Sequence, residues 1–198
     1  YISTLTYVME AGAENNVEII VLDRPNPHDG YIDGPVLKDQ WKSFVGMHNV
    51  PIVYGLTIGE YGKMVNGEKW LKNGVQAKYT LIPMQGYHKK QRYEISDKPS
   101  PNLPNDKSIN PYPSLCFFEG TQVSVGRGTN LPFQIYGSPW TKNLPYQFTP
   151  KPTSGAKDPF LNGKLCFGEN LSTYLNDLRE LNLDWLLNAH KNYKNSQQ

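Results

Sequence analysis

The placement of proline is the feature that most restricts how this 198-residue chain can fold. Five of its 16 prolines fall between Asp97 and Pro113, among Asn, Asp and Ser residues. Proline fixes φ and has no backbone N–H, so this composition is not expected to sustain a helix or a central strand. We therefore predict a linker over residues 98–113, between a domain over residues 1–97 and a second domain over residues 114–198.

The first 97 residues follow the order helix, strand, polar loop. Apolar residues recur at helical spacing over residues 2–16, which predicts an amphipathic helix. Residues 17–22, VEIIVL, are rich in β-branched side chains and predict a buried strand that ends at the polar sequence DRPNP. This order predicts an open α/β sheet, a fold class in which ligands collect at the carboxyl ends of the strands.

Two further elements are expected in the same domain. Thr57 and Glu60 have the spacing of a capping box, which predicts a helix from there to about residue 66. Residues 79–84, YTLIPM, are a second strand candidate.

The second domain is predicted to be a smaller α+β unit. Strands are expected at residues 115–118 and 133–136, on either side of a glycine-rich loop. Residues 172–193 place leucines, Trp185 and Ala189 on one helical face, which predicts a long helix with Ser172 or Thr173 as its cap.

Charge and composition argue against several classes of protein. The net charge is +2 and the basic run His88–Arg92 is short, so we expect a solvated loop there and no nucleic-acid partner. No stretch approaches the roughly 18 apolar residues of a membrane-spanning helix. The four histidines are scattered and are expected on the surface or in loops, which gives a metal site little support. No dinucleotide fingerprint, phosphate loop or nucleophile elbow is present, so no cofactor is expected.

The two cysteines lie inside apolar runs. Cys116 is in LCFF and Cys166 is in LCF, where a thiol behaves as a small hydrophobic group. Buried free thiols are the leading interpretation. A single disulfide in an oxidising compartment stays open, whereas the spacing excludes a zinc motif.

Three charged residues are candidates for chemistry. Asp23 ends the first predicted strand and Glu119 ends an apolar run, positions at which partial burial can tune a carboxyl group. Arg127 lies between Gly126 and Gly128, which allow the backbone to approach an acidic ligand closely or to take positive φ. The structural alternatives are that Asp23 caps its own turn, that Glu119 pairs with Arg127, and that Arg127 braces its loop.

Several motifs in a fixed order resemble one family. The runs VLDRPNP, GLTIGE, EGTQVSVGRGT and PFQIYGSPW are similar to those of the exo-β-N-acetylmuramidases of the NamZ type, and the likeness extends from residue 1 to about residue 140. Two segments depart from the family pattern: Val125 stands where an acid is common, and residues 154–157 replace a usual Ser-Lys-His segment.

The resemblance implies a Rossmann-like domain followed by an auxiliary domain, with a substrate cleft between them. It implies a cofactor-free glycosidase, periplasmic or secreted, that releases N-acetylmuramic acid from the non-reducing ends of peptidoglycan fragments. It also implies that this chain is an internal fragment, which lacks an upstream segment bearing a further glutamate and a continuation after the tail helix. The alternatives are a saccharide-binding module without activity and an α/β domain with an unrelated small-molecule ligand.

The candidate site residues are inferred from their residue types and positions together with the family resemblance. Glu119 is the predicted catalytic carboxylate, which acts on the glycosidic bond or the sugar hydroxyls, and Arg127 is predicted to bind the lactyl carboxylate of muramic acid. The other predicted substrate-binding residues are Asp23, Arg24, Asn26, Thr121 and Thr129. No metal ligand is predicted.

Overall fold

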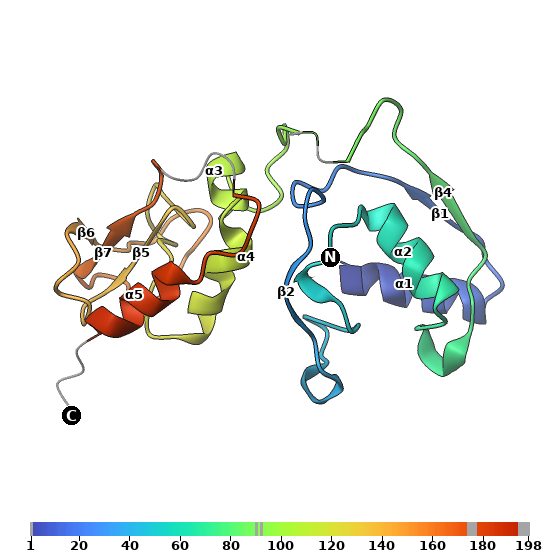
Figure 1. The fold of residues 1–198 in the computed structure, drawn as a ribbon, viewed down its shortest axis with the longest axis horizontal. Coiled ribbons are helices and arrows are strands. Elements are labelled where there is room, and N and C mark those ends of the chain that lie inside the picture. Colours follow the sequence, from blue (N-terminus) through green and yellow to red (C-terminus); the bar gives the residue numbers. More distant parts are fainter. Residues whose placement is uncertain (1, 90, 92, 174–177, 194–198) are drawn as a thin grey trace. The chain divides into compact units, whose positions relative to one another are not determined.

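The computed structural model describes residues 2–89, 91, 93–173 and 178–193 (Figure 1). The chain divides into two compact units, Tyr1–Tyr93 and Glu94–Gln198. The proline-rich segment therefore counts with the second unit, and the linker over residues 98–113 with its flanking domain ranges stays a prediction. Both units mix helices with small sheets, so the fold is of the mixed α/β type.

The first unit holds two longer helices and two strand pairs. Its elements in chain order are α1 (Ile2–Glu14), β1 (Ile19–Leu22), β2 (Asp33–Val36), the 3-10 turn η1 (Asp39–Trp41), β3 (Pro51–Val53), α2 (Ile58–Gly67), the 3-10 turn η2 (Lys72–Gly74) and β4 (Tyr79–Ile82). Strands β1 and β4 pair in parallel, with Ile19 opposite Tyr79 and Leu22 opposite Ile82, while β2 and β3 are antiparallel. Figure 1 shows α1 and α2 side by side against the β1–β4 pair. The predictions of α1, α2 and both parallel strands are confirmed, and each predicted end lies within two residues of the observed end.

Strand β1 departs from the prediction of a buried strand. Its exposure alternates along the strand: Ile20 is 58% exposed and Leu22 is 71% exposed, whereas Ile19 and Val21 are half-buried. The helices α1 and α2 cover one face of the sheet, so only the side chains on that face leave solvent. A continuous apolar run in the sequence was therefore not enough to predict burial on both faces.

Burial distinguishes His48 from the other histidines. It lies in a loop, as expected, but is only 6% exposed. Its Nε2 is 3.1 Å from Oγ1 of Thr6, and its ring stacks on Trp70 with centroids 5.4 Å apart. Burial, followed by the nearby charge of Lys42, lowers the pKa of His48. The neutral imidazole is therefore part of the packing between α1 and the loop before β3.

The first turn of α2 is closed by side-chain hydrogen bonds. Oγ1 of Thr57 accepts a hydrogen bond from the Glu60 backbone N–H at 3.2 Å, and the Glu60 carboxylate accepts one from the Thr57 N–H at 3.0 Å. The capping box is thus confirmed. The Thr57 hydroxyl also donates to Oδ2 of Asp23 at 2.7 Å, which ties the helix start to the end of β1.

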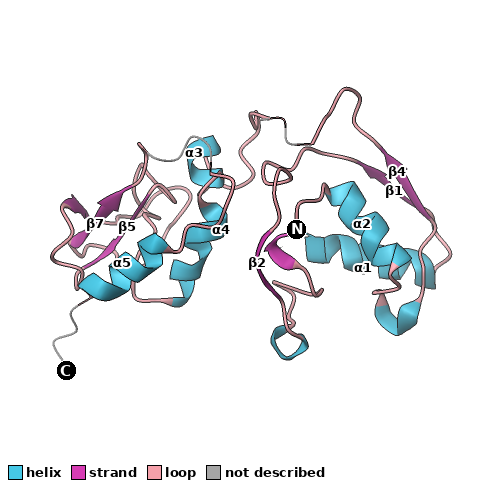
Figure 2. Ribbon diagram, in the orientation of Figure 1, coloured by secondary structure: helices cyan, strands magenta, loops and turns pink. Residues whose placement is uncertain are grey.

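The second unit is built on a three-stranded antiparallel sheet with short helices beside it (Figure 2). Its elements are α3 (Asp106–Ile109), α4 (Tyr112–Leu115), the 3-10 helix η3 (Cys116–Gly120), β5 (Ile135–Ser138), β6 (Tyr146–Phe148), β7 (Cys166–Asn170) and α5 (Asp184–Asn192). Strand β7 lies between β5 and β6. All four residues of β5 are buried, and the rings of Phe118 and Tyr136 stack with centroids 4.9 Å apart beneath it.

Two expectations for the start of this unit are wrong. The proline-rich segment does contain helix: Asn105 caps α3 by accepting a hydrogen bond from the Ser108 N–H at 3.0 Å, and Pro113 occupies the first turn of α4. Proline is tolerated there because the first N–H groups of a helix have no intrahelical acceptor. The strand expected at residues 115–118 is helical, because Leu115 and Phe118, spaced as i and i+3, both enter the core.

The later elements of this unit are shifted or shorter than expected. Strand β5 begins two residues after the predicted start, since Phe133 has a φ of 55° that a strand cannot contain. The long tail helix is confirmed only from Asp184 onward, residues 178–183 are not helical, and residues 174–177 lie outside the described residues. Asn182 explains the late start: its N–H donates to Oγ of Ser114, and its Oδ1 accepts from the Asp184 N–H.

Both cysteines are free thiols, in line with the leading interpretation. Cys166 is buried and Cys116 is half-buried. Burial raises the pKa of Cys116 to about 11 and that of Cys166 to about 12, so both stay protonated near neutral pH. Within the described parts of the chain, every helix is too short or too polar to cross a bilayer.

We predict that Thr57→Val destabilises the protein by about 1–3 kcal/mol, because it removes both the cap and the bond to Asp23. Thr57→Ser keeps the hydroxyl and loses one methyl group, for which about 1 kcal/mol or less is expected. Urea unfolding monitored by circular dichroism measures both values. Equal losses for the two variants would contradict a role for the hydroxyl.

We also predict a pH dependence of stability that originates at His48. Its pKa is lowered in the folded state, so the unfolded chain binds a proton first, and stability falls as the pH drops through about 6.5. Comparison of urea unfolding at about pH 7.5 and about pH 5.5 should show a smaller pH effect in His48→Gln than in the parent protein. The exposed His88 supplies the matched control, because His88→Gln should leave the pH effect unchanged.

Candidate functional site

A pocket of about 560 Å³ lies at the carboxyl ends of β1 and β4. Asp23 and Arg24 line it from the β1 side, and Gln85, Tyr87 and Tyr93 line it from the loop after β4. The carboxyl edge of parallel strands is where open α/β sheets bind their ligands, so this pocket is the site to which the sequence pattern pointed in the first unit.

Asp23 lines the pocket but its oxygens serve the protein. Oδ1 accepts hydrogen bonds from the N–H groups of Gly59, at 2.9 Å, and Arg24, at 3.0 Å, while Oδ2 accepts from Thr57. The carboxylate therefore caps the N-terminus of α2 as well as its own turn, where the helix dipole favours an anion. This arrangement matches the structural alternative for Asp23 more closely than a role in binding substrate.

Asn26 is likewise engaged by its own loop. Its Nδ2 donates to the Leu56 carbonyl oxygen at 2.8 Å, and its Oδ1 accepts from the His28 N–H at 2.9 Å. Both ends of the amide thus hold the loop after β1 against the segment before α2. The amide of Asn26 acts as a brace between two loops.

Of the three predicted site residues after β1, Arg24 is the one whose side chain is available to bind a ligand. Its side chain is exposed at the pocket, and among the described residues no carboxylate lies within ion-pair distance of it. A guanidinium in such a position can bind an anionic group in a bidentate manner.

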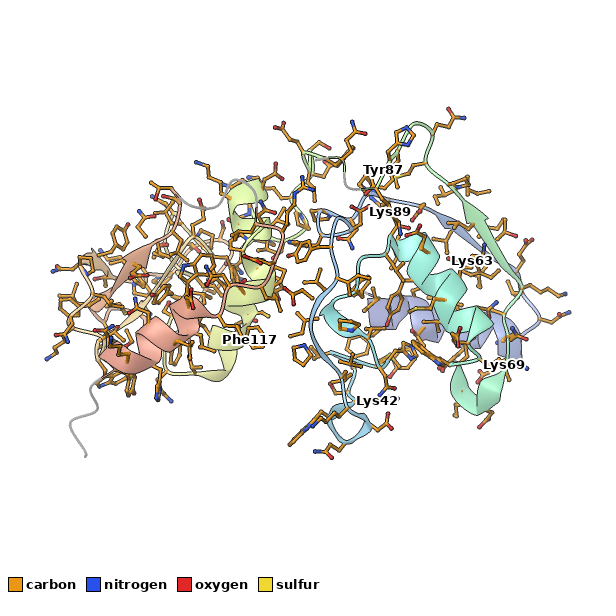
Figure 3. All side chains as sticks on the ribbon, viewed as in Figure 1. Lys42, Lys63, Lys69, Tyr87, Lys89 and Phe117 are labelled. Carbon is orange, nitrogen blue, oxygen red and sulfur yellow. The ribbon has the colours of Figure 1, made fainter. Side chains whose placement is uncertain are left out.

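Sequence reasoning missed the contacts that hold the loop after β4. The Tyr87 hydroxyl donates to Oδ2 of Asp29, a carboxylate that is only 8% exposed, and Nζ of Lys89 lies 2.7 Å from the Glu60 carboxylate. Figure 3 shows Tyr87 and Lys89 together at the N-terminal end of α2. Burial, then the bond to Asp29, raises the pKa of Tyr87, so the phenol remains a donor. The described residues of the basic run are exposed and lie in a loop, as expected, and Lys89 also links this loop to the helix.

The second unit brings Glu119 and Arg127 together. Nη2 of Arg127 donates to Oε1 of Glu119 in a close ion pair, and the two side chains are 43% and 36% exposed respectively. The Arg127 guanidinium also lies over the Phe133 ring, 5.3 Å from its centroid. Pairing within the loop was the structural alternative for Glu119, and the structure contains that pair.

The glycines on either side of Arg127 adopt the conformation that their sequence suggested. Gly126 has a φ of 80° and Gly128 a φ of 81°, a region that favours glycine because it has no Cβ. Arg127 is thereby carried on a tight loop, with Nε buried and without an acceptor among the described residues. The neighbouring Val125, at a position where the family pattern has an acid, is 5% exposed and belongs to the core.

The two threonines predicted to bind substrate serve local turns. Oγ1 of Thr121 donates to the Phe118 carbonyl oxygen at 2.7 Å and accepts from the Val123 N–H at 3.1 Å. Thr129 makes the same pair of contacts, with the Gly126 carbonyl oxygen at 2.7 Å and the Leu131 N–H at 3.0 Å. Their hydroxyl protons are therefore already donated within the protein.

No group of three or more His, Cys, Asp or Glu side chains among the described residues is arranged to hold a metal ion. The predicted site residues fall into two sets, one in each unit. Asp23, Arg24 and Asn26 lie in the segment after β1, Glu119 is in η3, and Thr121, Arg127 and Thr129 lie in the loops between η3 and β5.

Comparison with known families settles what kind of chain this is. A family model described as the N-terminal part of the exo-beta-N-acetylmuramidase NamZ matches residues 1–107, and one described as its C-terminal part matches residues 110–197. The chain belongs to the NamZ family. The family resemblance inferred from the sequence motifs is therefore confirmed.

Individual NamZ relatives agree with this assignment. The peptidoglycan beta-N-acetylmuramidase NamZ of Bacillus subtilis (strain 168) is 39% identical over 156 residues, which are 75% of this chain and 36% of that protein. Two solved DUF1343 family proteins from Bacteroides fragilis NCTC 9343 are similar in structure. One has a TM-score of 0.94 at 47% identity, over 97% of this chain and 55% of its own. The other has a TM-score of 0.73 at 30% identity, over 90% of this chain and 51% of its own.

We predict that the two charged residues at the end of β1 differ sharply in their effect on stability. Asp23→Asn should lower the free energy of unfolding by about 1–3 kcal/mol, because a charged acceptor for three donors is lost. Arg24→Ala, a surface change in the same pocket, should alter it by less than about 0.5 kcal/mol. Thermal and urea unfolding of both variants test the contrast, which fails if Asp23→Asn is as stable as the parent protein.

Proposed function

We propose that the protein to which this chain belongs is an exo-β-N-acetylmuramidase that releases N-acetylmuramic acid from the non-reducing ends of peptidoglycan fragments. The observation that carries the proposal is the match of both NamZ family models, in order, over residues 1–107 and 110–197. The peptidoglycan beta-N-acetylmuramidase of Bacillus subtilis supports it at 39% identity. Because the chain covers 36% of that relative, the activity is assigned to the whole protein.

The Glu119–Arg127 pair suits an acidic sugar. The lactyl carboxylate of muramic acid matches the fork of an arginine, and Arg127 has N–H groups beyond the one that contacts Glu119. The carboxylate of a bound sugar would share the Arg127 guanidinium with Glu119 and so reduce the neutralisation of the Glu119 charge. We assign Arg127 to substrate binding, and Glu119 to a role in its charged form, as base, nucleophile or charge stabiliser.

Glycoside hydrolysis commonly uses two carboxyl groups about 5 to 9.5 Å apart. We propose that Glu119 is one of them and that the other is supplied by a segment of the same protein upstream of this chain. That segment would also extend the β1–β4 pair into a Rossmann-like sheet, since a parallel pair is normally part of a larger, helix-covered sheet. A substrate drawn from the cell wall favours a periplasmic or secreted location.

The test is the rate at which the intact protein releases N-acetylmuramic acid from a chromogenic muramide. Glu119→Gln keeps the size of the side chain and should reduce kcat by about a hundredfold or more if the carboxylate acts in the reaction. Arg127→Lys should raise KM more than it lowers kcat, because lysine cannot form the bidentate contact. Unchanged turnover in Glu119→Gln would leave the carboxylate as a loop brace only.

A second candidate function is a saccharide-binding module without activity. The observation in its favour is that Glu119 is already committed to an ion pair. A module of this kind would show a ligand-induced rise in melting temperature and no release of sugar from any muramide. The intact protein thus distinguishes the two candidates in a single pair of assays.

A further inference from the structure

A second pocket, of about 490 Å³, lies in the unit formed by residues 94–198. It is lined by Pro145, Tyr146, Glu169, Asn170, Leu171 and Trp185. These residues come from the start of β6 and the residue before it, from the end of β7 and the residue after it, and from the first turn of α5. None of them was a candidate site residue in the sequence, and none takes part in the Glu119–Arg127 pair.

The carboxylate in this pocket is held in a fixed orientation. Tyr136 and Glu169 are directly opposite each other on β5 and β7, and the Tyr136 hydroxyl donates to Oε2 of Glu169 at 2.6 Å. Nδ2 of Asn188, on α5, donates to Oε1 at 2.7 Å. Asn192 in turn donates to Oδ1 of Asn188, which sets the orientation of that amide. The Glu169 side chain is thus positioned by both neighbouring elements of the fold.

Both donors to Glu169 are neutral, so they orient its negative charge without cancelling it. Burial, followed by the bond to Glu169, raises the pKa of Tyr136 and keeps the phenol in its donating form. Each carboxylate oxygen has a second lone pair that receives no donor from the described residues, so it can accept from a group that enters the pocket. The pocket therefore offers strong acceptors at fixed positions to groups that donate hydrogen bonds.

The remaining walls suit the apolar face of a ring. Tyr146 and Trp185 are both half-buried, so each presents part of an aromatic surface. Aromatic surface next to an oriented acceptor matches a sugar ring, which has apolar C–H faces and hydroxyl donors at its edge. A negatively charged wall disfavours an acidic sugar by like-charge repulsion.

We propose that the pocket between β6, β7 and α5 is a binding subsite for a neutral N-acetylhexosamine ring, with Glu169 accepting its hydroxyl or amide protons and Tyr146 and Trp185 packing against it. The choice of N-acetylglucosamine as this sugar rests on the proposed function, because peptidoglycan alternates N-acetylglucosamine with N-acetylmuramic acid. The subsite binds glycan at a position distinct from the acidic sugar assigned to Arg127.

The test is a titration of the intact protein with methyl N-acetyl-β-D-glucosaminide, followed by the tryptophan indole N–H signals in two-dimensional NMR. The chain has 4 tryptophans, and Trp185→Phe assigns the relevant signal. The Trp185 signal should shift and saturate, while the Trp140 signal of the same unit stays in place and reports that the unit is folded. N-acetylmuramic acid should shift the Trp185 signal with at least about tenfold weaker affinity, a difference of about 1.4 kcal/mol.

Two variants locate the contact. Glu169→Gln and Tyr146→Ala should each weaken binding by about tenfold or more, whereas Gln147→Ala, an exposed neighbour on β6, should leave the affinity unchanged. If Tyr146→Ala loses the native Trp140 signal, Glu169→Gln alone decides, because it preserves shape. Absence of any shift at Trp185, or equal binding by parent and Glu169→Gln, overturns the proposal.

Turnover of the chromogenic muramide is measured on the same samples. Turnover without a shift at Trp185 rejects the subsite and leaves the proposed activity standing. A saturable shift at Trp185 without turnover supports the subsite and rejects the activity. The two proposals therefore fail independently.

Discussion

The bond between the end of β1 and the start of α2 is the constraint on which the first unit depends. One carboxylate, Asp23, accepts hydrogen bonds from the Thr57 hydroxyl and from two backbone N–H groups. It satisfies donors that a helix terminus leaves open, and it does so with an anion where the helix dipole favours one. Because the bond fixes where the strand ends, it also fixes the position of the pocket beside it, which Asp23 and Arg24 line.

Sequence reasoning worked where the decisive contacts are local. The start of α2 could be predicted because Thr57 and Glu60 are three residues apart and bond to each other. The conformations of Gly126 and Gly128 followed from residue type in the same way. Sequence reasoning failed where tertiary packing determines the secondary structure. The apolar residues 115–118 are helical because the core lies on one helical face. The tail helix begins at Asp184 because Asn182 bonds to Ser114.

The same distinction separates the site residues that could be predicted from those that could not. Glu119 and Arg127 are only eight residues apart, and their pairing was one of the alternatives that the sequence left open. Tyr87 and Asp29 are 58 residues apart, and Tyr136 and Glu169 are 33 apart. The second pair depends on the register of β5 against β7, which periodicity does not reveal, because alternation predicts the face of a side chain but not its cross-strand partner.

Three carboxylates in this chain differ in what their partners leave them free to do. Both oxygens of Asp23 accept hydrogen bonds from donors at the start of α2, so its charge stabilises the fold. Glu119 is balanced by a guanidinium, and an acidic ligand that competes for Arg127 would change that balance at the place where it binds. Glu169 is oriented by a phenol and an amide that leave its charge in place, which favours neutral sugars and repels acidic ones. A glycan in which neutral and acidic sugars alternate would need both kinds of environment, and the second unit contains one of each.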